Sequence, residues 1–238
     1  MATITAGKYG NVVNSSELGW MTARGASTGQ NVQNQSTSTN TEQVRVYYAS
    51  GGKGSEWTVR RMFLAFDATA YQTGYTITDL KLYYKPTTST TGSSGAGMKM
   101  ALVKSTAQGD ADTNLTTSDF NNFDDTVDYA ANDGSTDVTW TDLSTLQSVD
   151  LNATAISAIT STGYLKICIM EYLYDYPDTA PTVSGTNMRA YANFSTVPYL
   201  SFTATPLGYG NDVIGVSSSN IDEVISVATA NIDEIIGV

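Results

Sequence analysis

The stretch VRRMFLAFD at residues 59–67 decides the fold. Its residues alternate, so that Met62, Leu64 and Phe66 fall on one face of an extended strand. The same period of two recurs in ITDLKLYYKP at residues 77–86 and in GYLKICIM at residues 163–170. The other positions expected on inward faces are Val44, Val46, Tyr48, Leu80, Leu82, Tyr84, Met98, Met100, Leu102, Leu165, Ile167, Ile169, Leu200 and Phe202.

These short strands, the many loops between them and a single short helix predict an all-β fold, an antiparallel jelly-roll β-sandwich. Asn152 is placed to cap the start of the helix and Gly163 to end it. A parallel α/β fold is disfavoured because repeated long helices are missing. We expect an N-terminal arm with edge strands and a polar loop at residues 1–41, the sandwich at 42–206 and a repeat-bearing C-terminal extension at 207–238.

The composition excludes several classes of function. The 238 residues include no His and one Cys, and 12 Lys and Arg stand against 23 Asp and Glu, for a net charge of -11. Without His there is no Ser-His-Asp relay and no His-containing zinc site. A single thiol makes no intrachain disulfide, and the negative charge repels a nucleic-acid backbone. We therefore expect no enzyme, no cofactor and no nucleic-acid partner.

The location of the protein is inferred from two features of the sequence. Thr, Ser, Asn and Gly replace charge, and the chain has 15 Tyr, a composition typical of extracellular and virion proteins. The start MATITAGKYGNVVN is not a secretory signal, and no apolar segment is long enough to span or insert into a membrane. We expect a virion protein assembled in the host cytoplasm, with an extracellular or cell-surface protein as the alternative.

An eleven-residue repeat occupies the C-terminal extension. Asn220-Ile221-Asp222-Glu223 recurs as Asn231-Ile232-Asp233-Glu234. This period fits a right-handed helical coil, but the Gly, Ser and β-branched residues favour short strands and turns. The extension must bury its apolar side chains, and we expect it to do so against another subunit. The candidates for this assembly contact are Ile214, Val216, Ile221, Ile225, Val227, Ile232, Ile236 and Val238.

Several segments together resemble the DNRLRE-type jelly-roll modules, carbohydrate-binding-like sandwiches found in secreted proteins and tailed-phage structural proteins. The segments are RRMFLAFD, ITDLKLYYK, LTTSDFNNF, VDLNATAISAI, GYLKICIM and PYLSFTAT, between Gln43 and Thr205. The family's charged signature is not kept, and the nearest piece is NMRA at residues 187–190. The extension is similar to the NI-x-x-(I/V)-x-G-V repeats appended to phage virion proteins. The resemblance implies a phage structural protein.

Two acidic loops are candidates for ion binding or catalysis. One carries Asp119, Asp124, Asp125 and Asp128, and the other carries Glu171, Asp175 and Asp178. Neither has the spacing of a known calcium loop, and we expect solvated carboxylates, with Asp175 and Asp178 as weak Ca²⁺ candidates. The opposed carboxylates of a glycosidase are disfavoured.

Alternating tyrosines follow the last strongly apolar strand. Tyr172, Tyr174 and Tyr176 in EYLYDYPD are expected to share one face of the strand and its loop. Three interpretations stay open: a subunit interface, packing beneath a loop, or stacking on sugar rings. An interface or packing is favoured over glycan binding.

Arginine, cysteine and tryptophan positions complete the candidates. Arg60 and Arg61 are expected to be solvated, or to hold one ion pair between subunits. Cys168 is expected to be a packed, inert thiol. Trp20, Trp57 and Trp140 are interpreted as packing anchors near loops.

The sequence favours a non-enzymatic structural component of a tailed-phage virion, either a capsid decoration or a fibre or appendage protein. Its partners would be copies of itself and other virion proteins. The alternative is a module of the virion or cell surface that binds a surface glycan.

Overall fold

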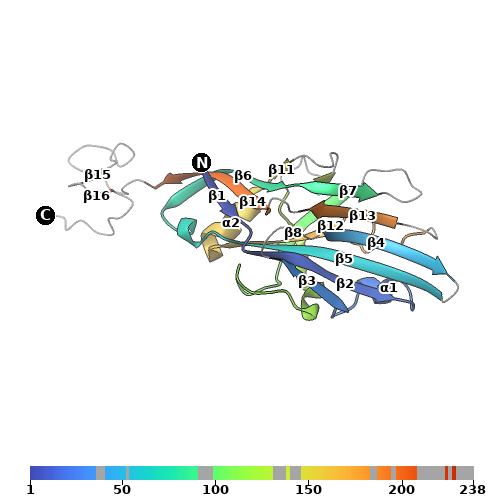
Figure 1. Ribbon diagram of the computed structural model, residues 1–238. Coiled ribbons are helices and arrows are strands. Elements are labelled where there is room, and N and C mark those ends of the chain that lie inside the picture. The colour runs from blue at the N-terminus through green and yellow to red at the C-terminus, as the bar shows by residue number, and fades with distance from the viewer. Residues whose placement is uncertain are drawn as a thin grey trace.

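The computed structural model describes residues 1–35, 41–51, 54–90, 99–130, 138–139, 146–182, 187–193, 197–207, 223–224 and 227–228. The chain forms an antiparallel all-β sandwich of two sheets, as predicted (Figure 1). The jelly-roll order of strands stays a prediction. In the described residues, no helix is long and apolar enough to cross a membrane.

The small sheet has four strands. Its order is β1 (Ala2–Thr5), β14 (Tyr199–Pro206), β6 (Tyr75–Tyr84) and β11 (Gln147–Asp150). The large sheet runs in the order β10 (Val138–Thr139), β8 (Lys99–Ser105), β12 (Tyr164–Glu171), β5 (Gly54–Asp67), β4 (Thr41–Gly51), β13 (Asn187–Asn193) and β7 (Pro86–Thr90). Two further pairings complete it: β2 (Lys8–Ser16) joins β5 and β3 (Asn31–Gln35), and β9 (Phe123–Asp128) joins β8.

Strand β5 lies inside the large sheet, and one of its two edges changes partner along its length. The edge that does not change partner pairs with β2 along residues 57–65. On the other edge, Arg60 lies opposite Arg45 of β4, whereas Met62 lies opposite Ile169 of β12. The sheet therefore branches at Arg61.

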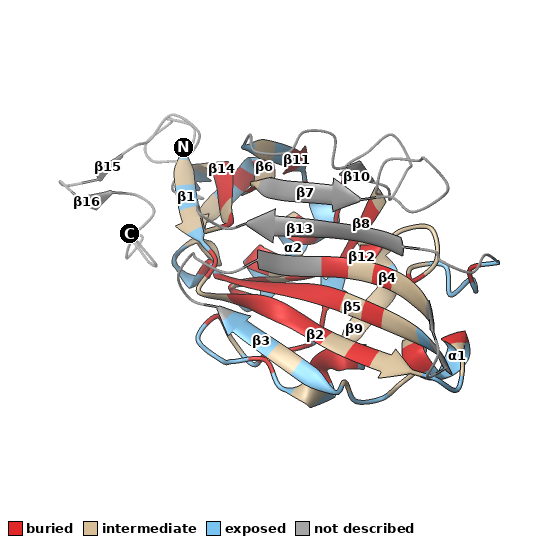
Figure 2. Cartoon of the chain, turned by 45° about the vertical axis from the view of Figure 1, so that its right-hand side comes forward, coloured by how far each residue is buried: buried red, intermediate tan, exposed pale blue. Residues whose placement is uncertain are grey.

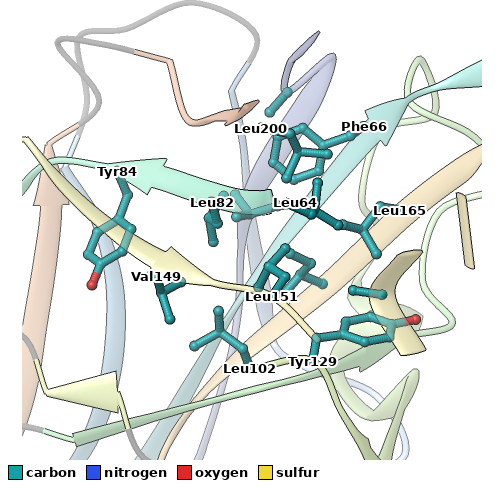
Figure 3. Close-up of a cluster of buried hydrophobic side chains, with 14 of the residues drawn as sticks. Leu64, Phe66, Leu82, Tyr84, Leu102, Tyr129, Val149, Leu151, Leu165 and Leu200 are labelled. Carbon is teal, nitrogen blue, oxygen red and sulfur yellow. The ribbon is translucent and has the colours of Figure 1, made fainter. Parts of the chain in front are cut away.

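The face of the large sheet that carries Met62, Leu64 and Phe66, called here the first face, packs against the small sheet. Leu64 and Phe66 meet Leu82 of β6 and Leu200 of β14 in the core between the sheets (Figure 3). The predicted inward positions in the described residues are confirmed here, apart from Val46, which belongs to the core of the opposite face, and Tyr48, which is half-buried against Trp57 beside that core. Met98 lies outside the described residues.

The opposite face of the large sheet, called here the second face, is covered by loops and short helices instead of a sheet. Its core contains Val59 and Phe63 of β5 with Trp20, Leu115 and Phe120 from the covering segments. These segments include α1 (Trp20–Arg24) and the 3₁₀ helix η2 (Thr117–Asn121). As a result residues 61–66 of β5 are buried on both faces (Figure 2).

The predicted helix is α2 (Ala153–Thr162), and both of its end signals are confirmed. The Asn152 side chain accepts hydrogen bonds from the backbone N–H groups of Thr154 and Ala155. Gly163 ends the helix with a φ of 76°, in the left-handed region. The 3₁₀ helix η1 (Thr69–Tyr71) packs nearby, and its Thr69 lies against Gly163.

The first 41 residues do not form a separate arm. Strand β1 is an edge strand, as expected, but β2 is paired along both edges and Tyr9 and Val12 are buried in the two cores. The segment around Trp20 forms α1, not an edge strand. The expected boundary between residues 41 and 42 therefore falls inside the sandwich, because β5 needs β2 as its neighbour.

Candidate functional site

A loop that follows β12 brings most of the candidate residues together. We call residues 172–178 the tyrosine loop. The Glu171 side chain is fully buried, and its carboxylate accepts hydrogen bonds from the backbone N–H groups of Leu173 at 2.7 Å, Tyr174 at 2.7 Å and Asp175 at 3.2 Å. The N–H of Tyr176 donates to the Glu171 carbonyl at 2.9 Å. One carboxylate thus folds the chain back on itself.

The three tyrosines lie in this turn, not along a strand, because β12 ends at Glu171. Tyr172 and Tyr176 stack with ring centroids 5.7 Å apart and planes 15° apart. All three rings are half-buried against the core of the second face. Of the three interpretations, packing is what the described residues show. The interface and the glycan stay predictions.

Asp175 joins the tyrosine loop to β5 through an ion pair with Arg61. Both side chains are fully buried, at 0% exposure. The Arg61 Nη2 donates to Asp175 Oδ1 at 2.6 Å and Nε donates to Oδ2 at 2.9 Å, a two-point pairing of guanidinium and carboxylate. The expectation that Arg61 and Asp175 are solvated is wrong, because α1, η2 and the tyrosine loop cover the ion pair on the second face.

Arg61 also holds two other covering segments. Its Nη1 donates to the Phe120 carbonyl at 2.8 Å, and its Nη2 donates to the Arg24 carbonyl at 3.1 Å. The guanidinium carbon lies 4.3 Å from the ring centroid of Phe120 and 4.6 Å from that of Phe123. A single buried side chain therefore fastens the end of α1, η2 and the tyrosine loop to β5.

Arg24 closes the cluster toward the surface. Its guanidinium lies 3.5 Å from the Asp175 carboxylate, 3.3 Å from Asp178 and 3.6 Å from Asp125. It also donates to the Asp175 carbonyl. The weak Ca²⁺ candidates Asp175 and Asp178 are thus held by arginines, and the described residues contain no group of three or more acidic or thiol side chains that could hold a metal ion.

Burial raises the pKa of two groups beside the cluster. The pKa of Glu171 is raised to about 7, chiefly because the buried carboxylate loses its hydration, against the effect of the three N–H donors. Burial likewise raises the pKa of the Cys168 thiol well above its usual range. Cys168 is a free, buried thiol, and the raised pKa keeps it protonated and unreactive, as predicted.

The acidic loop that follows η2 and its neighbours contains both solvent-exposed and buried carboxylates. Asp124 and Asp125 keep solvent contact, but Asp119 is buried and accepts from the N–H and hydroxyl of Thr116, which caps η2. Asp128 is half-buried, and desolvation raises its pKa. The expectation of solvated carboxylates is wrong for Asp119 and for Glu171.

Two of the three tryptophans pack against each other. Trp20 and Trp57 pack edge to face with centroids 5.6 Å apart, which confirms them as packing residues; Trp140 lies outside the described residues.

The assembly candidates of the C-terminal extension are not tested by the structure. Val227 lies in β16 (Val227–Ala228), whose side chains are not described. The remaining assembly candidates lie outside the described residues: Ile214, Val216, Ile221, Ile225, Ile232, Ile236 and Val238.

Sequence reasoning missed Arg24 and the role of Arg61, although a signal for Arg61 was present. Arg61 lies between Val59 and Phe63 in the period of two, and an arginine on such an apolar face requires buried partners.

Comparison with protein-family models gives no match, and comparison with curated proteins gives none either.

Proposed function

We propose that the protein is a non-enzymatic structural component of a tailed-phage virion, a capsid decoration or a fibre or appendage protein. In this proposal the sandwich is a rigid jelly-roll block, and copies assemble through the C-terminal extension.

One observation carries the assembly part of the proposal. Two described strands of the extension, β15 (Glu223–Val224) and β16 (Val227–Ala228), form a two-stranded sheet in which Val224 lies opposite Val227. These four residues form short strands, as the sequence predicts. They pair with no described strand of the sandwich. A two-stranded sheet is marginally stable alone, so the repeat gains stability by packing against a neighbour.

The charged cluster supports the rigid-block part of the proposal. Arg61 and Arg24 bind carboxylates and carbonyl groups within the protein, and the carboxylate of Glu171 binds backbone N–H groups. The interactions of the two arginines join segments that are far apart in the sequence, and those of Glu171 hold the tyrosine loop in its turn. Such an arrangement holds a shape and suits a protein whose surface must present fixed contacts to its neighbours.

Removal of residues 209–238 tests the proposal. The truncated chain is expected to be a folded monomer, measured by circular dichroism and by light scattering after size-exclusion chromatography, whereas the full chain assembles. A full-length variant with Ile221, Ile225, Ile232 and Ile236 changed to Ser keeps the length and charge of the extension. It should also stay monomeric. Normal assembly of both variants would refute the connector role.

The virion assignment needs a separate measurement. Antibodies against the folded sandwich should label purified phage particles at regular positions in electron micrographs, and mass spectrometry of those particles should detect the chain in many copies. Absence from washed particles would exclude the assignment.

A glycan-binding module is the second candidate, and the stacked tyrosines are the observation that favours it. Tyr172 and Tyr176 are half-exposed on a loop that Glu171 and Arg61 hold in place, with the Lys99 ammonium 5.9 Å from the Tyr172 ring centroid. A glycan array with the full chain tests this candidate. Binding that is lost in Tyr172→Ala and Tyr174→Ala would support it, and an array without signal would exclude it.

A further inference from the structure

Two of the large apolar side chains that the described residues expose lie close together in the sequence, at α1. Leu18, just before the helix, is 85% exposed, and Met21 in the helix is 66% exposed. The others are Met1, Leu146 and Leu207, which lie far from one another along the chain. Single exposed apolar residues are common on protein surfaces, whereas two at one short helix mark a local apolar patch.

The helix that carries this patch is held firmly in place. Two of its other residues, Trp20 and Ala23, are buried in the core of the second face. The Asn14 side chain donates to the Ala23 carbonyl at 2.9 Å, and Arg61 donates to the carbonyl of Arg24 at 3.1 Å. The two exposed side chains therefore stand on a fixed backbone, so little backbone freedom is lost when a partner covers them.

Aromatic rings continue from α1 to two neighbouring strands. Trp20 packs edge to face on Trp57 of β5, and Trp57 packs on its register partner Tyr48 of β4, with ring centroids 4.6 Å apart. Trp57 and Tyr48 are half-buried, so each keeps part of its surface exposed. We call Leu18, Met21, Trp57 and Tyr48 the apolar tip. Met and aromatic side chains of this kind are enriched in protein interfaces.

The C-terminal extension begins at the other end of the sandwich. Strand β14 leads into the extension, and its last residues run past Ala2 of β1, which lies opposite Phe202. Figure 1 and Figure 2 both show the N-terminus at one end of the sandwich and α1 at the other. Each copy therefore starts its extension far from its own apolar tip, and copies placed end to end bring the extension of one next to the tip of another.

The extension has the apolar side chains that suit this surface. It carries the eight Ile and Val candidates for assembly contacts named above. Its two described strands, β15 and β16, pair with each other and with no described strand of the sandwich. The repeat and the apolar tip thus both gain stability when a contact between them removes apolar surface from water.

We propose that the apolar tip is the docking site for the Ile and Val side chains of the C-terminal extension of another copy of this chain. The proposal rests on the proposed function and adds the surface that receives the extension. Because the extension and the tip lie at opposite ends of each copy, the contact is head to tail. Repetition of such a contact builds an open filament, or a ring where the rotation between copies closes.

Charge opposes this contact, so apolar burial must drive it. Glu17 and Glu56 are exposed and adjoin Leu18 and Trp57 in the chain, and each repeat of the extension carries an Asp-Glu pair. Salt screens the repulsion between these carboxylates, so assembly should strengthen as NaCl is raised from about 0.05 to about 0.5 M. Sedimentation of the full chain measures this. Weakening over the same range would contradict an apolar contact.

Polar replacement tests the docking site. Leu18→Gln/Met21→Gln keeps the size of two exposed side chains, so the variant should keep the melting temperature of the parent. It is expected to lower the assembly affinity by about tenfold or more in sedimentation of the full chain. Leu18→Gln alone should also weaken assembly, whereas the matched control Leu146→Gln should not. Normal assembly of the double variant, with loss of assembly on deletion of residues 209–238, would keep the proposed function and reject only this surface.

Mixing two defective chains tests docking between copies and its direction. One chain lacks residues 209–238 but keeps the apolar tip, and the other carries Leu18→Gln/Met21→Gln but keeps the extension. We expect a one-to-one complex that neither protein forms alone. Each of the two should also shorten the assemblies of the parent chain in electron micrographs, because it stops growth at one end. Absence of the complex, or a parent chain that forms only closed dimers, would overturn head-to-tail docking.

Discussion

The two faces of the large sheet are covered in different ways. The first face packs on another sheet through apolar side chains such as Leu64, Phe66 and Leu82. The second face is covered by α1, η2 and the tyrosine loop, which Arg61 joins through hydrogen bonds and an ion pair. The comparison shows that a regular sheet can cover its neighbour by apolar packing, whereas irregular segments need a central hydrogen-bond donor as well.

Among the variants that test this difference between the faces, replacement of Arg61 should lower the free energy of unfolding most. Arg61→Met leaves the Asp175 carboxylate buried with only Arg24 beside it, and the free energy of unfolding should fall by about 3–5 kcal/mol in urea titrations. Amide hydrogen exchange should rise first in α1, η2 and the tyrosine loop. The double variant Arg61→Met/Asp175→Leu should regain part of the loss because both buried charges are removed. A change below about 1 kcal/mol for Arg61→Met would show that the second face does not depend on the ion pair.

Truncation in the core between the sheets should cost slightly less and act differently. Leu82 is fully buried, and Leu82→Ala should lower the free energy of unfolding by about 3–4 kcal/mol through lost burial and a cavity. Exchange should rise through the whole sandwich, with no preference for the tyrosine loop. A selective rise in that loop would contradict the separation of the two faces.

The buried Glu171 should make stability depend on pH. Its pKa is about 7 in the folded protein against 4.5 when unfolded, so the folded state binds the proton more tightly. Stability from this group is complete below pH 4.5 and is lost as the pH rises to 7, by about 3 kcal/mol in total. The chain has no His, the side chain that ordinarily titrates in this range.

Glu171→Gln is the matched variant for this titration. The amide keeps one acceptor for the loop and carries no titratable proton, so the decrease in the free energy of unfolding between pH 5 and 8 should disappear. Urea titrations at several pH values measure both proteins. An unchanged slope in Glu171→Gln would assign the pH dependence to another group.

Glycine replacements should give the smallest effects and separate two causes. Gly163 has φ 76° and a Cβ there would lie 2.7 Å from the Thr69 side chain, whereas Gly74 has φ 80° and open space around it. Gly74→Ala should cost about 1 kcal/mol from backbone strain alone. Gly163→Ala should cost about 1 kcal/mol more because Thr69 must move. Equal melting temperatures for the two variants would show that the contact with Thr69 has no cost.

The parts of the fold predicted from sequence are those with a local signal. Met62, Leu64 and Phe66 recur with a period of two, and this pattern alone predicts the strand and its inward face. The caps of α2 were predicted for the same reason, because Asn152 binds N–H groups only two and three residues away. Such signals can be recognised in the sequence without knowledge of how the rest of the chain folds.

The candidate site was predicted only in part. The alternation of the three tyrosines and the acidic cluster around Asp175 mark this segment as a candidate site. Their surroundings could not be predicted, because the turn at Glu171 ends the strand before the alternation of the tyrosines can place them on a sheet. Arg24 had no local signal, since its carboxylate partners lie on β9 and in the tyrosine loop.

By itself the sequence determined the class of fold, the face of β5 that packs on the small sheet, the helix ends and the exclusion of His-based chemistry. Tertiary structure alone decided which charges are buried. Arg61 meets partners that are 37, 59 and 114 residues away, at Arg24, Phe120 and Asp175. Burial of a charge is favourable only when all of these partners arrive together, and they do so where α1, η2 and the tyrosine loop meet over the second face of the large sheet.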